Sequence, residues 1–256
     1  MPVIITLTTD FGARDPYAGV MKGVILGIAP EARIVDITHE VPPFDTEAAT
    51  FAVLQALPYF PPDTIHLVVV DPEVGTRRRA LAAAGRRARF VGPDNGVLAP
   101  LLDADGPARV FDISQSPLLP EARSSTFHGR DVFAPAAAHL AAGISLERLG
   151  QPIDTPTAAR TSGPERRDDG WHGRVVHVDR FGNLITNLDT RHAVELAALR
   201  VEGMTLPLAN AYADIAKGTV GALLGSAGHI EVFLREGSAA NALRAGIGTP
   251  VLGVIV

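Results

Sequence analysis

The sequence predicts an α/β N-terminal domain, with a parallel-type sheet flanked by helices, and a smaller antiparallel β domain after it. Strand-like and helix-like segments alternate in the first part of the chain, which is the pattern of a parallel sheet with right-handed crossovers. After residues 151–173, which are rich in Pro, Gly, Ser and charge, short strand-like segments follow with little helix. We therefore expect domains at 1–155 and 173–256, joined by a linker at 156–172.

The strands of the first domain are predicted from short runs of apolar and β-branched residues, as expected for strands covered on both faces. These runs lie at 3–8, 33–38, 64–70, 80–85, 89–92 and 109–113. In the second domain, strands are predicted at 174–179, 184–188, 200–208, 228–235 and 249–256. The residues alone leave a barrel and a sandwich open for this domain.

Three helices are predicted in the first domain. They lie at 17–29, 46–57 and 130–143. Asp15 and Asp45 stand just before the first two helices, and we expect them to cap those helices. In the first helix, Val20, Val24 and Ile28 recur at helical spacing, so this stripe is expected to face the core.

Composition indicates a globular protein and excludes several classes of partner. Hydrophobic residues make up 46% of the 256 residues, and the net charge of −5 argues against a nucleic acid or an anionic membrane held by bulk electrostatics. The chain has no cysteine, which excludes disulfides and thiolate chemistry. No signal peptide is recognised, and no apolar stretch is long enough to span a bilayer. We expect a soluble, cytoplasmic protein.

Polar side chains follow the predicted strands, where ligands bind in open parallel sheets. Asp10 ends the first strand, Asp36 and His39 end the second, and Asp71 ends the third. His128 lies in a loop just before the third helix. Taken singly, each of these residues is also typical of a turn, a helix cap or a packed loop. The sequence has no dinucleotide fingerprint, phosphate loop, zinc-type spacing or serine elbow, so a dinucleotide or nucleotide-triphosphate enzyme is not expected, nor is a metal site.

Seven short motifs occur in order along the chain: "TTDFG", "YAGVMKG", "VDITH", "VDPEVGTRRR", "PDNG", "STFHGRD" and "DRFGNLITN". Together they resemble the SAM hydroxide adenosyltransferases, the adenosine-forming S-adenosyl-L-methionine hydrolases, which are relatives of the bacterial fluorinase and chlorinase. The resemblance covers nearly the whole chain. It implies an α/β N-terminal domain, a C-terminal β-barrel, and a homotrimer that holds SAM between the N-terminal domain of one subunit and the C-terminal domain of its neighbour.

The resemblance also implies a reaction and the residues that carry it. Water or hydroxide would attack C5′ of the ribose of SAM and give adenosine and L-methionine, with no cofactor. The family's catalytic triad falls on Asp71, Arg78 and His128. Asp10 is implied to bind the ribose hydroxyls, and Phe44 to line the ligand.

Further substrate contacts are implied in the second domain. Asp179 would hold the methionine ammonium, while Phe181 and Asn183 would contact the adenine. Tyr212 lies where an aromatic ring stacks on the adenine, and Ser226 is placed to meet the methionine carboxylate.

The resemblance also bears on two glutamates. Glu231 is implied to add a polar contact to the substrate, although an outward-facing strand position fits it as well. Glu73 stands where the family usually has Gly after Asp-Pro. If that position needs a positive φ, Glu73 stores strain of about 1 kcal/mol or more.

Two other functions fit the same motifs. A SAM-dependent halogenase would form a 5′-halo-5′-deoxyadenosine, but an aspartate facing the halide would repel it, and the extra loop of the halogenases is missing from the short segment 80–96. A non-catalytic SAM or adenosine sensor would not need an Asp-Arg-His set that faces water.

Three arginines are consecutive at 77–79. Because side chains alternate along an extended segment, Arg77 and Arg79 point away from the face of Arg78, and we expect both to be solvated.

Overall fold

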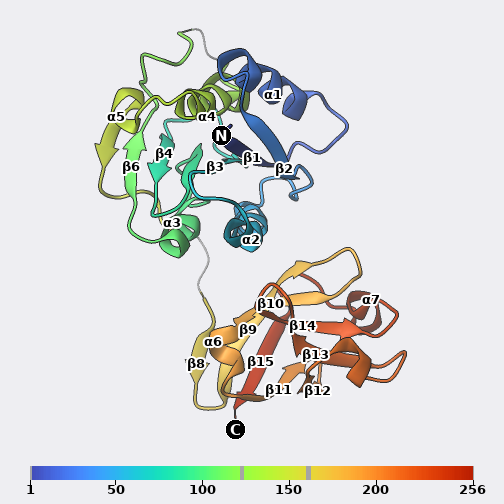
Figure 1. Ribbon diagram of the computed structural model, residues 1–256. Coiled ribbons are helices and arrows are strands. Elements are labelled where there is room, and N and C mark those ends of the chain that lie inside the picture. Colours follow the sequence, from blue (N-terminus) through green and yellow to red (C-terminus); the bar gives the residue numbers. More distant parts are fainter. Residues whose placement is uncertain (1, 122–123, 160–162, 256) are drawn as a thin grey trace. The chain divides into compact units, whose positions relative to one another are not determined.

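The computed structural model describes residues 2–121, 124–159 and 163–255, and it divides into two compact units, Met1–Thr161 and Ser162–Val256 (Figure 1). Each unit has its own sheet and its own buried core. Within the described residues, no helix combines the length and the apolar character needed to cross a lipid bilayer.

The first unit is built on a seven-stranded sheet in the order β2-β1-β3-β5-β4-β6-β7. Its strands are β1 (Ile4–Thr9), β2 (Arg33–Thr38), β3 (Ile65–Val69), β4 (Ala80–Ala84), β5 (Arg89–Pro93), β6 (Arg109–Asp112) and β7 (Gln151–Ile153). β1, β2, β3 and β5 run parallel, so their carboxyl ends share one edge of the sheet. β4 turns back on β5 through the short connection 85–88, and β6 and β7 continue the antiparallel pairing. The predicted α/β class is confirmed, with a sheet that is mixed rather than wholly parallel.

Helices cover both faces of this sheet (Figure 1). α1 (Tyr17–Ile28), α4 (Ala134–Ala141) and α5 (Leu146–Leu149) contribute to one buried core, whereas α2 (Thr46–Ala56) and α3 (Ala99–Asp105) contribute to another. A short 3-10 helix, η1 (Leu57–Tyr59), follows α2. Because both faces are covered, every residue of β3 is buried, which explains its continuous apolar sequence.

The N-termini of α1 and α2 differ in how they are capped. Asp45 caps α2, and its Oδ1 accepts a hydrogen bond from the backbone N–H of Ala48 at 2.9 Å, as predicted. The predicted cap at Asp15 is wrong, since α1 begins at Tyr17, directly after Pro16, without a side-chain hydrogen bond at its N-terminus. Pro16 occupies the position that the capping side chain would need.

The predicted buried stripe of α1 is only partly confirmed. Val24 and Ile28 are partly buried against the core, but Val20 is exposed, and the fully buried residues of the helix are Ala18, Met21 and Ile25. α1 is apolar on nearly all sides, so the spacing of its valines does not identify the face that meets the sheet.

The third predicted helix forms in two parts. A single π turn, η2 (Gly129–Phe133), leads directly into α4. Pro135 lies in the first turn of α4, where its missing N–H is not needed. The π turn widens the chain immediately after His128, and such turns are frequent at functional sites.

The second unit is a barrel. Its strands are β9 (Gly170–Val178), β10 (Leu184–Asp189), β11 (Leu196–Val201), β12 (Met204–Ala209), β13 (Val220–Leu224), β14 (His229–Leu234) and β15 (Pro250–Ile255). They follow the order β10-β14-β13-β12-β11-β15-β9, and β9 pairs with β10 to close the ring. All of these pairs are antiparallel except β12 with β13. Short helices lie in the connections: α6 (Thr190–Ala193), η3 (Tyr212–Asp214) and α7 (Ala239–Leu243).

An additional strand lies inside the segment 156–172, which the sequence predicts as a linker. β8 (Glu165–Arg167) pairs with the start of β9 at Gly170 and extends the barrel wall. All three residues of β8 are charged and exposed, so no hydrophobic pattern reveals this strand.

His66 is a wholly buried polar residue on β3. Its Nδ1 lies 2.8 Å from Oγ1 of Thr6 on β1, and its ring stacks on Phe90. Among the described residues, Nε2 has no hydrogen-bond partner. Burial lowers the pKa of His66 to about 4, against an opposing effect of the charge on Asp105. His66 is therefore neutral in the folded protein at neutral pH.

We predict that the free energy of unfolding decreases as the pH is lowered from 6.5 to 4. Unfolded His66 binds a proton below its ordinary pKa of 6.5, whereas folded His66 binds one only near pH 4, so protons favour the unfolded state in this interval. The expected loss from this residue is roughly 3 kcal/mol. Chemical denaturation of the wild type and of His66→Gln across this pH range measures it. Equal pH slopes in the two proteins would contradict the prediction.

Candidate active site

A pocket of about 270 Å³ lies at the carboxyl ends of β1 and β3 in the first unit. Asp10 follows β1, Asp71 follows β3, Phe44 comes from the loop before α2, and His128 precedes η2. These four predicted site residues line the same pocket, together with Phe11, Tyr17, Pro43, Val69, Val74, Thr126, Phe127 and Gly129. The parallel half of the sheet therefore brings together residues that are far apart in the sequence.

Asp71, Arg78 and His128 form one hydrogen-bonded set. Nε of Arg78 donates to both carboxylate oxygens of Asp71, at 3.0 Å each, and Nη2 makes a further short contact with Oδ2. The same Nη2 lies 2.7 Å from Nδ1 of His128. The side chains of Arg78 and Asp71 are only 5% and 6% exposed, so solvent screens this pair weakly. The predicted triad is thus assembled at the rim of the pocket.

The contact with Arg78 fixes the tautomer of His128. A guanidinium has only donors, so Nδ1 of His128 accepts the hydrogen bond and carries no proton. The proton of the neutral ring then lies on Nε2. His128 therefore cannot take a proton at Nδ1 while this contact is present.

A tight turn after β3 orients the side chain of Asp71 towards the pocket. Oδ1 of Asp71 accepts the backbone N–H of Glu73 at 3.3 Å, and the N–H of Thr76 bonds the carbonyl oxygen of Glu73. Positive φ is required at Gly75 (+80°) and not at Glu73, so Glu73 stores no left-handed strain. A Cβ at Gly75 would also lie 2.5 Å from the carbonyl oxygen of Ser125. The glutamate is accommodated because the special backbone conformation falls two residues later.

Asp10 holds the Phe44 loop against the pocket. Its Oδ2 accepts the backbone N–H of Phe44 at 2.9 Å. Phe44 has a φ of 68°, which is uncommon for a bulky residue, and its side chain is 69% exposed. Burial raises the pKa of Asp10, as does the charge of Asp71, while the bond from Phe44 lowers it. Asp10 and Phe44 thus act as a pair whose strained loop presents an aromatic ring at the mouth of the pocket.

Three aromatic residues of the pocket were not among the predicted site residues. Phe11, Tyr17 and Phe127 pack against one another, with ring centroids 5.2 to 5.9 Å apart. Phe11 and Phe127 are immediate neighbours of Asp10 and His128 in the sequence. This adjacency could have identified Phe11 and Phe127, because strand ends and loops that carry polar site residues also carry the apolar residues that line the pocket beside them.

Arg79 is not simply solvated, which corrects the expectation from its alternation with Arg78. Its Nε donates to Oδ2 of the buried Asp94 at 2.6 Å. Oδ1 of Asp94 accepts the backbone N–H of Thr157 at 2.7 Å. Asp94 therefore links the segment around Thr157 to the end of β5 through this hydrogen bond.

A second pocket, of about 680 Å³, lies in the second unit. Phe181, Asn183 and Tyr212 line it, together with Phe233 and Arg235, which the sequence did not single out. The complete lining also includes Ala213, Leu234, Glu236 and Gly237. Three predicted contact residues of the second domain therefore meet in one hollow.

The other predicted residues of the second unit do not line this hollow. Asp179 accepts the backbone N–H groups of Phe181 (2.9 Å) and Asn183 (2.8 Å) and so shapes the turn between β9 and β10. Ser226 lies in the turn between β13 and β14, outside the lining of the pocket. Glu231 is buried on β14 and accepts a short hydrogen bond from the hydroxyl of Tyr212.

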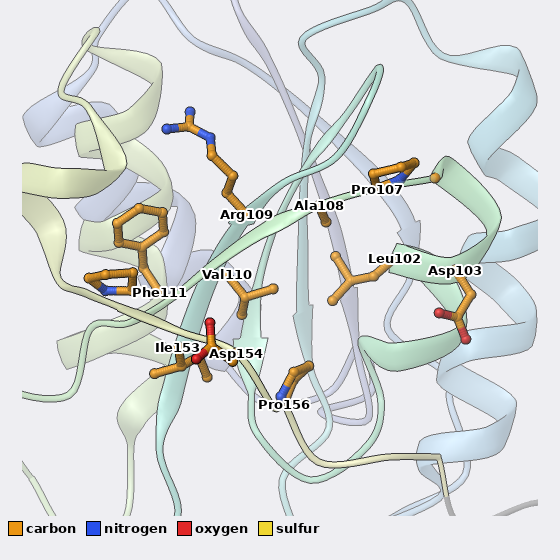
Figure 2. Close-up of a pocket in the computed structure, with 12 residues that line it drawn as sticks. Leu102, Asp103, Pro107, Ala108, Arg109, Val110, Phe111, Ile153, Asp154 and Pro156 are labelled. Carbon is orange, nitrogen blue, oxygen red and sulfur yellow. The ribbon is translucent and has the colours of Figure 1, made fainter.

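A third hollow, of about 690 Å³, shows that size alone does not identify the site. Figure 2 shows its lining, in which Leu102, Val110 and Ile153 supply apolar surface. It lies over β6 and β7, at the antiparallel end of the sheet, and contains none of the predicted site residues. The smaller pocket at the parallel strand ends carries the linked titratable groups, so we take that pocket as the candidate active site.

Comparison with known proteins gives the same family in both units. The family of SAM hydroxide adenosyltransferase N-terminal domains matches residues 5–150, and that of the C-terminal domains matches residues 173–252. An (R)-S-adenosyl-L-methionine hydrolase of Thermus thermophilus is 43% identical over 95% of this chain and 96% of its own. A second (R)-S-adenosyl-L-methionine hydrolase, from Salinispora tropica, is 37% identical over 93% of each chain.

More distant and structural relatives agree with this grouping. A fluorinase of Nocardia brasiliensis is 28% identical, over 97% of this chain and 96% of its own. The crystal structure of an uncharacterized conserved protein from Thermotoga maritima has a TM-score of 0.90 and 36% identity, covering 97% of this chain and 98% of its own.

We predict that His128 carries its ring proton on Nε2 at neutral pH, because Arg78 donates to Nδ1. Long-range nitrogen-15 correlation NMR distinguishes the two tautomers by the chemical shifts of the ring nitrogens. In Arg78→Ala the constraint is lost, and the Nδ1–H form should become populated. A wild-type ring that is protonated mainly on Nδ1 would contradict the arrangement.

Proposed function

The chain belongs to the SAM hydroxide adenosyltransferase family, and on that premise we propose that it hydrolyses S-adenosyl-L-methionine to adenosine and L-methionine. Water or hydroxide would attack C5′ of the ribose. The observation that carries the proposal is the hydrogen-bonded set of Asp71, Arg78 and His128 at the rim of a pocket at the strand ends. The reaction uses no cofactor or metal in this proposal.

The chemistry of the substrate explains why such a set is sufficient. SAM carries a sulfonium, so methionine departs as a neutral thioether and needs no acid to protonate it. The demanding task is to align one water opposite the C5′–S bond and to exclude competing solvent. The C–O bond forms as the C–S bond breaks, the electron pair of that bond goes to sulfur, and the water loses one proton.

Each member of the set has a separate task in this proposal. Asp71, which lines the pocket, orients the attacking oxygen and accepts its proton. Arg78 offsets the charge of Asp71 and holds both partners in place with a fixed fork of donors. His128 positions the water rather than acting as its base, since the only ring nitrogen without a proton already accepts from Arg78.

Residues of both units account for substrate binding in the proposal. Asp10 binds the ribose hydroxyls and Phe44 covers the ligand, while Asp179 holds the methionine ammonium and Ser226 the carboxylate. The adenine contacts come from Phe181, Asn183 and Tyr212, which share the pocket of the second unit. We also propose a homotrimer, in which the ligand meets the first unit of one subunit and the second unit of a neighbour.

A halogenase is the second candidate, and three observations disfavour it. The carboxylate of Asp71 lines the pocket and would repel a halide at short range. β4 and β5 are joined by residues 85–88 alone, without an inserted loop. The hydrolase relative is also more similar than the fluorinase, at 43% against 28% identity. A non-catalytic sensor remains the third candidate, and only turnover distinguishes it.

We predict adenosine and L-methionine as the products when the purified protein is incubated with SAM. The incubation is run in buffer without halide, with chloride and with fluoride, and the nucleosides are separated by chromatography. Adenosine in all three buffers supports hydrolysis. A halogenated nucleoside would support the halogenase, and unchanged SAM would support the sensor.

We predict that Asp71→Ala and His128→Ala reduce kcat far more than they weaken SAM binding, because both residues act on the attacking water. The expected loss in kcat is about 100-fold or more for Asp71→Ala, the usual scale for a group that assists proton transfer. Arg77→Ala, an exposed neighbour of Arg78, is the matched control and should keep its activity. Steady-state kinetics with calorimetric SAM binding measures both quantities. Equal losses in kcat and affinity would show that these residues only build the pocket.

A further inference from the structure

The loop that follows β2 is bonded to the end of β1 and its following turn on both sides of Asp10. The backbone N–H of Gly12 donates to the carbonyl oxygen of His39 at 2.7 Å. The side chains of Thr9 and His39 are linked as well, with Oγ1 and Nδ1 2.8 Å apart. Asp10 lies between Thr9 and Gly12 in the sequence, and Phe44 follows His39 in the same loop. Both of these pocket residues therefore lie on segments that His39 joins.

Contacts between side chains continue from Thr9 in two directions. Nε2 of His39 lies 3.1 Å from Oδ1 of Asp36, and Nζ of Lys22 on α1 donates to Oδ2 of the same carboxylate at 2.5 Å. At the other end, the backbone N–H of Phe11 donates to Oγ1 of Thr9 at 3.3 Å. Of these residues, only Phe11 lines the pocket. The connected side chains thus support the pocket without forming its surface.

The carboxylate of Asp36 sets the direction of these hydrogen bonds. Burial raises the pKa of Asp36, but the bonds from Lys22 and His39 outweigh burial and lower it, so the group is ionised and accepts only. The ring nitrogen that faces it, Nε2 of His39, therefore carries a proton. In the neutral ring Nδ1 is then the acceptor, and the hydroxyl of Thr9 donates to it. The same hydroxyl oxygen accepts the N–H of Phe11, so each donor meets an acceptor.

The burial of Thr9 makes this arrangement important for Asp10. Thr9 is wholly buried on β1, and a buried hydroxyl that loses its partner is costly. Its bond to His39 thus holds the residue immediately before Asp10. Oδ2 of Asp10 in turn accepts the backbone N–H of Phe44. A loop that is ordered before a ligand arrives loses less entropy on binding, so the bond should favour affinity.

We infer that His39 is a positioning residue of the pocket in the first unit: through Thr9 it holds the Asp10 carboxylate and the Phe44 loop in place for a ligand. His39 itself does not touch that ligand. The identity of the ligand as the ribose of SAM or adenosine rests on the proposed function. The effect of His39 falls on binding rather than on the attack at C5′, because Asp71, Arg78 and His128 are held by separate bonds.

A double-mutant cycle tests the inference, with calorimetric binding of adenosine and the KM and kcat for SAM as readouts. The variants are Thr9→Val, His39→Ala, His39→Asn and the double variant Thr9→Val/His39→Ala. Thr9→Val and His39→Ala should each weaken adenosine binding and raise KM on the order of tenfold, with little change in kcat, because each removes the same hydrogen bond. The double variant should lose no more than the weaker-binding single variant. His39→Asn keeps an acceptor near the position of Nδ1 and should bind within about threefold of the wild type.

Thr8→Val is the matched control for loss of a buried hydroxyl. Thr8 is also wholly buried on β1, and among the described residues its Oγ1 has no hydrogen-bond partner. It should bind adenosine as the wild type does. An equal loss in Thr8→Val would overturn the inference, because any change in this strand would then disturb the pocket. Unchanged binding in His39→Ala, additive losses in the double variant, or a fall in kcat as large as the loss of affinity would each overturn it too.

Two further outcomes are distinguishable. If thermal melting shows that His39→Ala does not fold, Thr9→Val and His39→Asn decide: a tenfold loss in the former with recovery in the latter supports the inference, and unchanged binding in Thr9→Val overturns it. A wild type that binds adenosine but leaves SAM intact contradicts the proposed function, while the binding cycle still tests the role of His39. A wild type that does not bind adenosine overturns the inference.

Discussion

The arrangement of the first unit depends on the fork of donors that Arg78 places between Asp71 and His128. One guanidinium bonds both oxygens of the carboxylate and the Nδ1 of the imidazole, so it sets the orientation of both rim residues at once. Because the side chains of Arg78 and Asp71 are almost fully withdrawn from water, the loss of the cation would leave a buried carboxylate without its partner, which is a costly state. A lysine could supply the charge but not the planar fork. The site therefore depends on both the charge and the planar geometry of residue 78.

The parallel half of the sheet explains why this set forms where it does. β1 and β3 are neighbours and end at the same edge, so Asp10 and Asp71 are brought together although α1, β2 and α2 lie between them in the sequence. His128, which directly precedes the π turn before α4, comes from a third part of the chain. In the barrel, by contrast, the pocket residues come from turns and from one wall strand. The two pockets are thus built by different means.

Much of this organisation can be predicted from the sequence, and the exceptions have physical causes. The central strands β1 and β3 are visible because both faces of the sheet are covered there, so nearly all of their side chains are buried and their sequences are mostly apolar or β-branched. The buried face of α1 is only partly visible, because a helix that is apolar on nearly all sides fits more than one orientation. β8 is not visible either, since an exposed edge strand of Glu and Arg has no apolar face. The set of Asp71, Arg78 and His128 was predicted through ordered motifs, whereas Phe11, Tyr17 and Phe127 lie within the same motifs but were not assigned to the site.

The contacts of Asp94 have a practical consequence for separating the two units. This aspartate is buried at the end of β5 and accepts the backbone N–H of Thr157, and the glycine two residues later leaves space for the carbonyl oxygen of Ala158. A recombinant fragment that ended at residue 155 would lack the backbone N–H of Thr157, so the buried carboxylate of Asp94 would lose one hydrogen-bond donor. The expected loss in the free energy of unfolding is about 1–3 kcal/mol. Gly96 would also lose its contact with Ala158. A fragment that extends through residue 159 keeps both contacts. The natural place to cut this chain therefore lies several residues beyond the last strand of the first sheet.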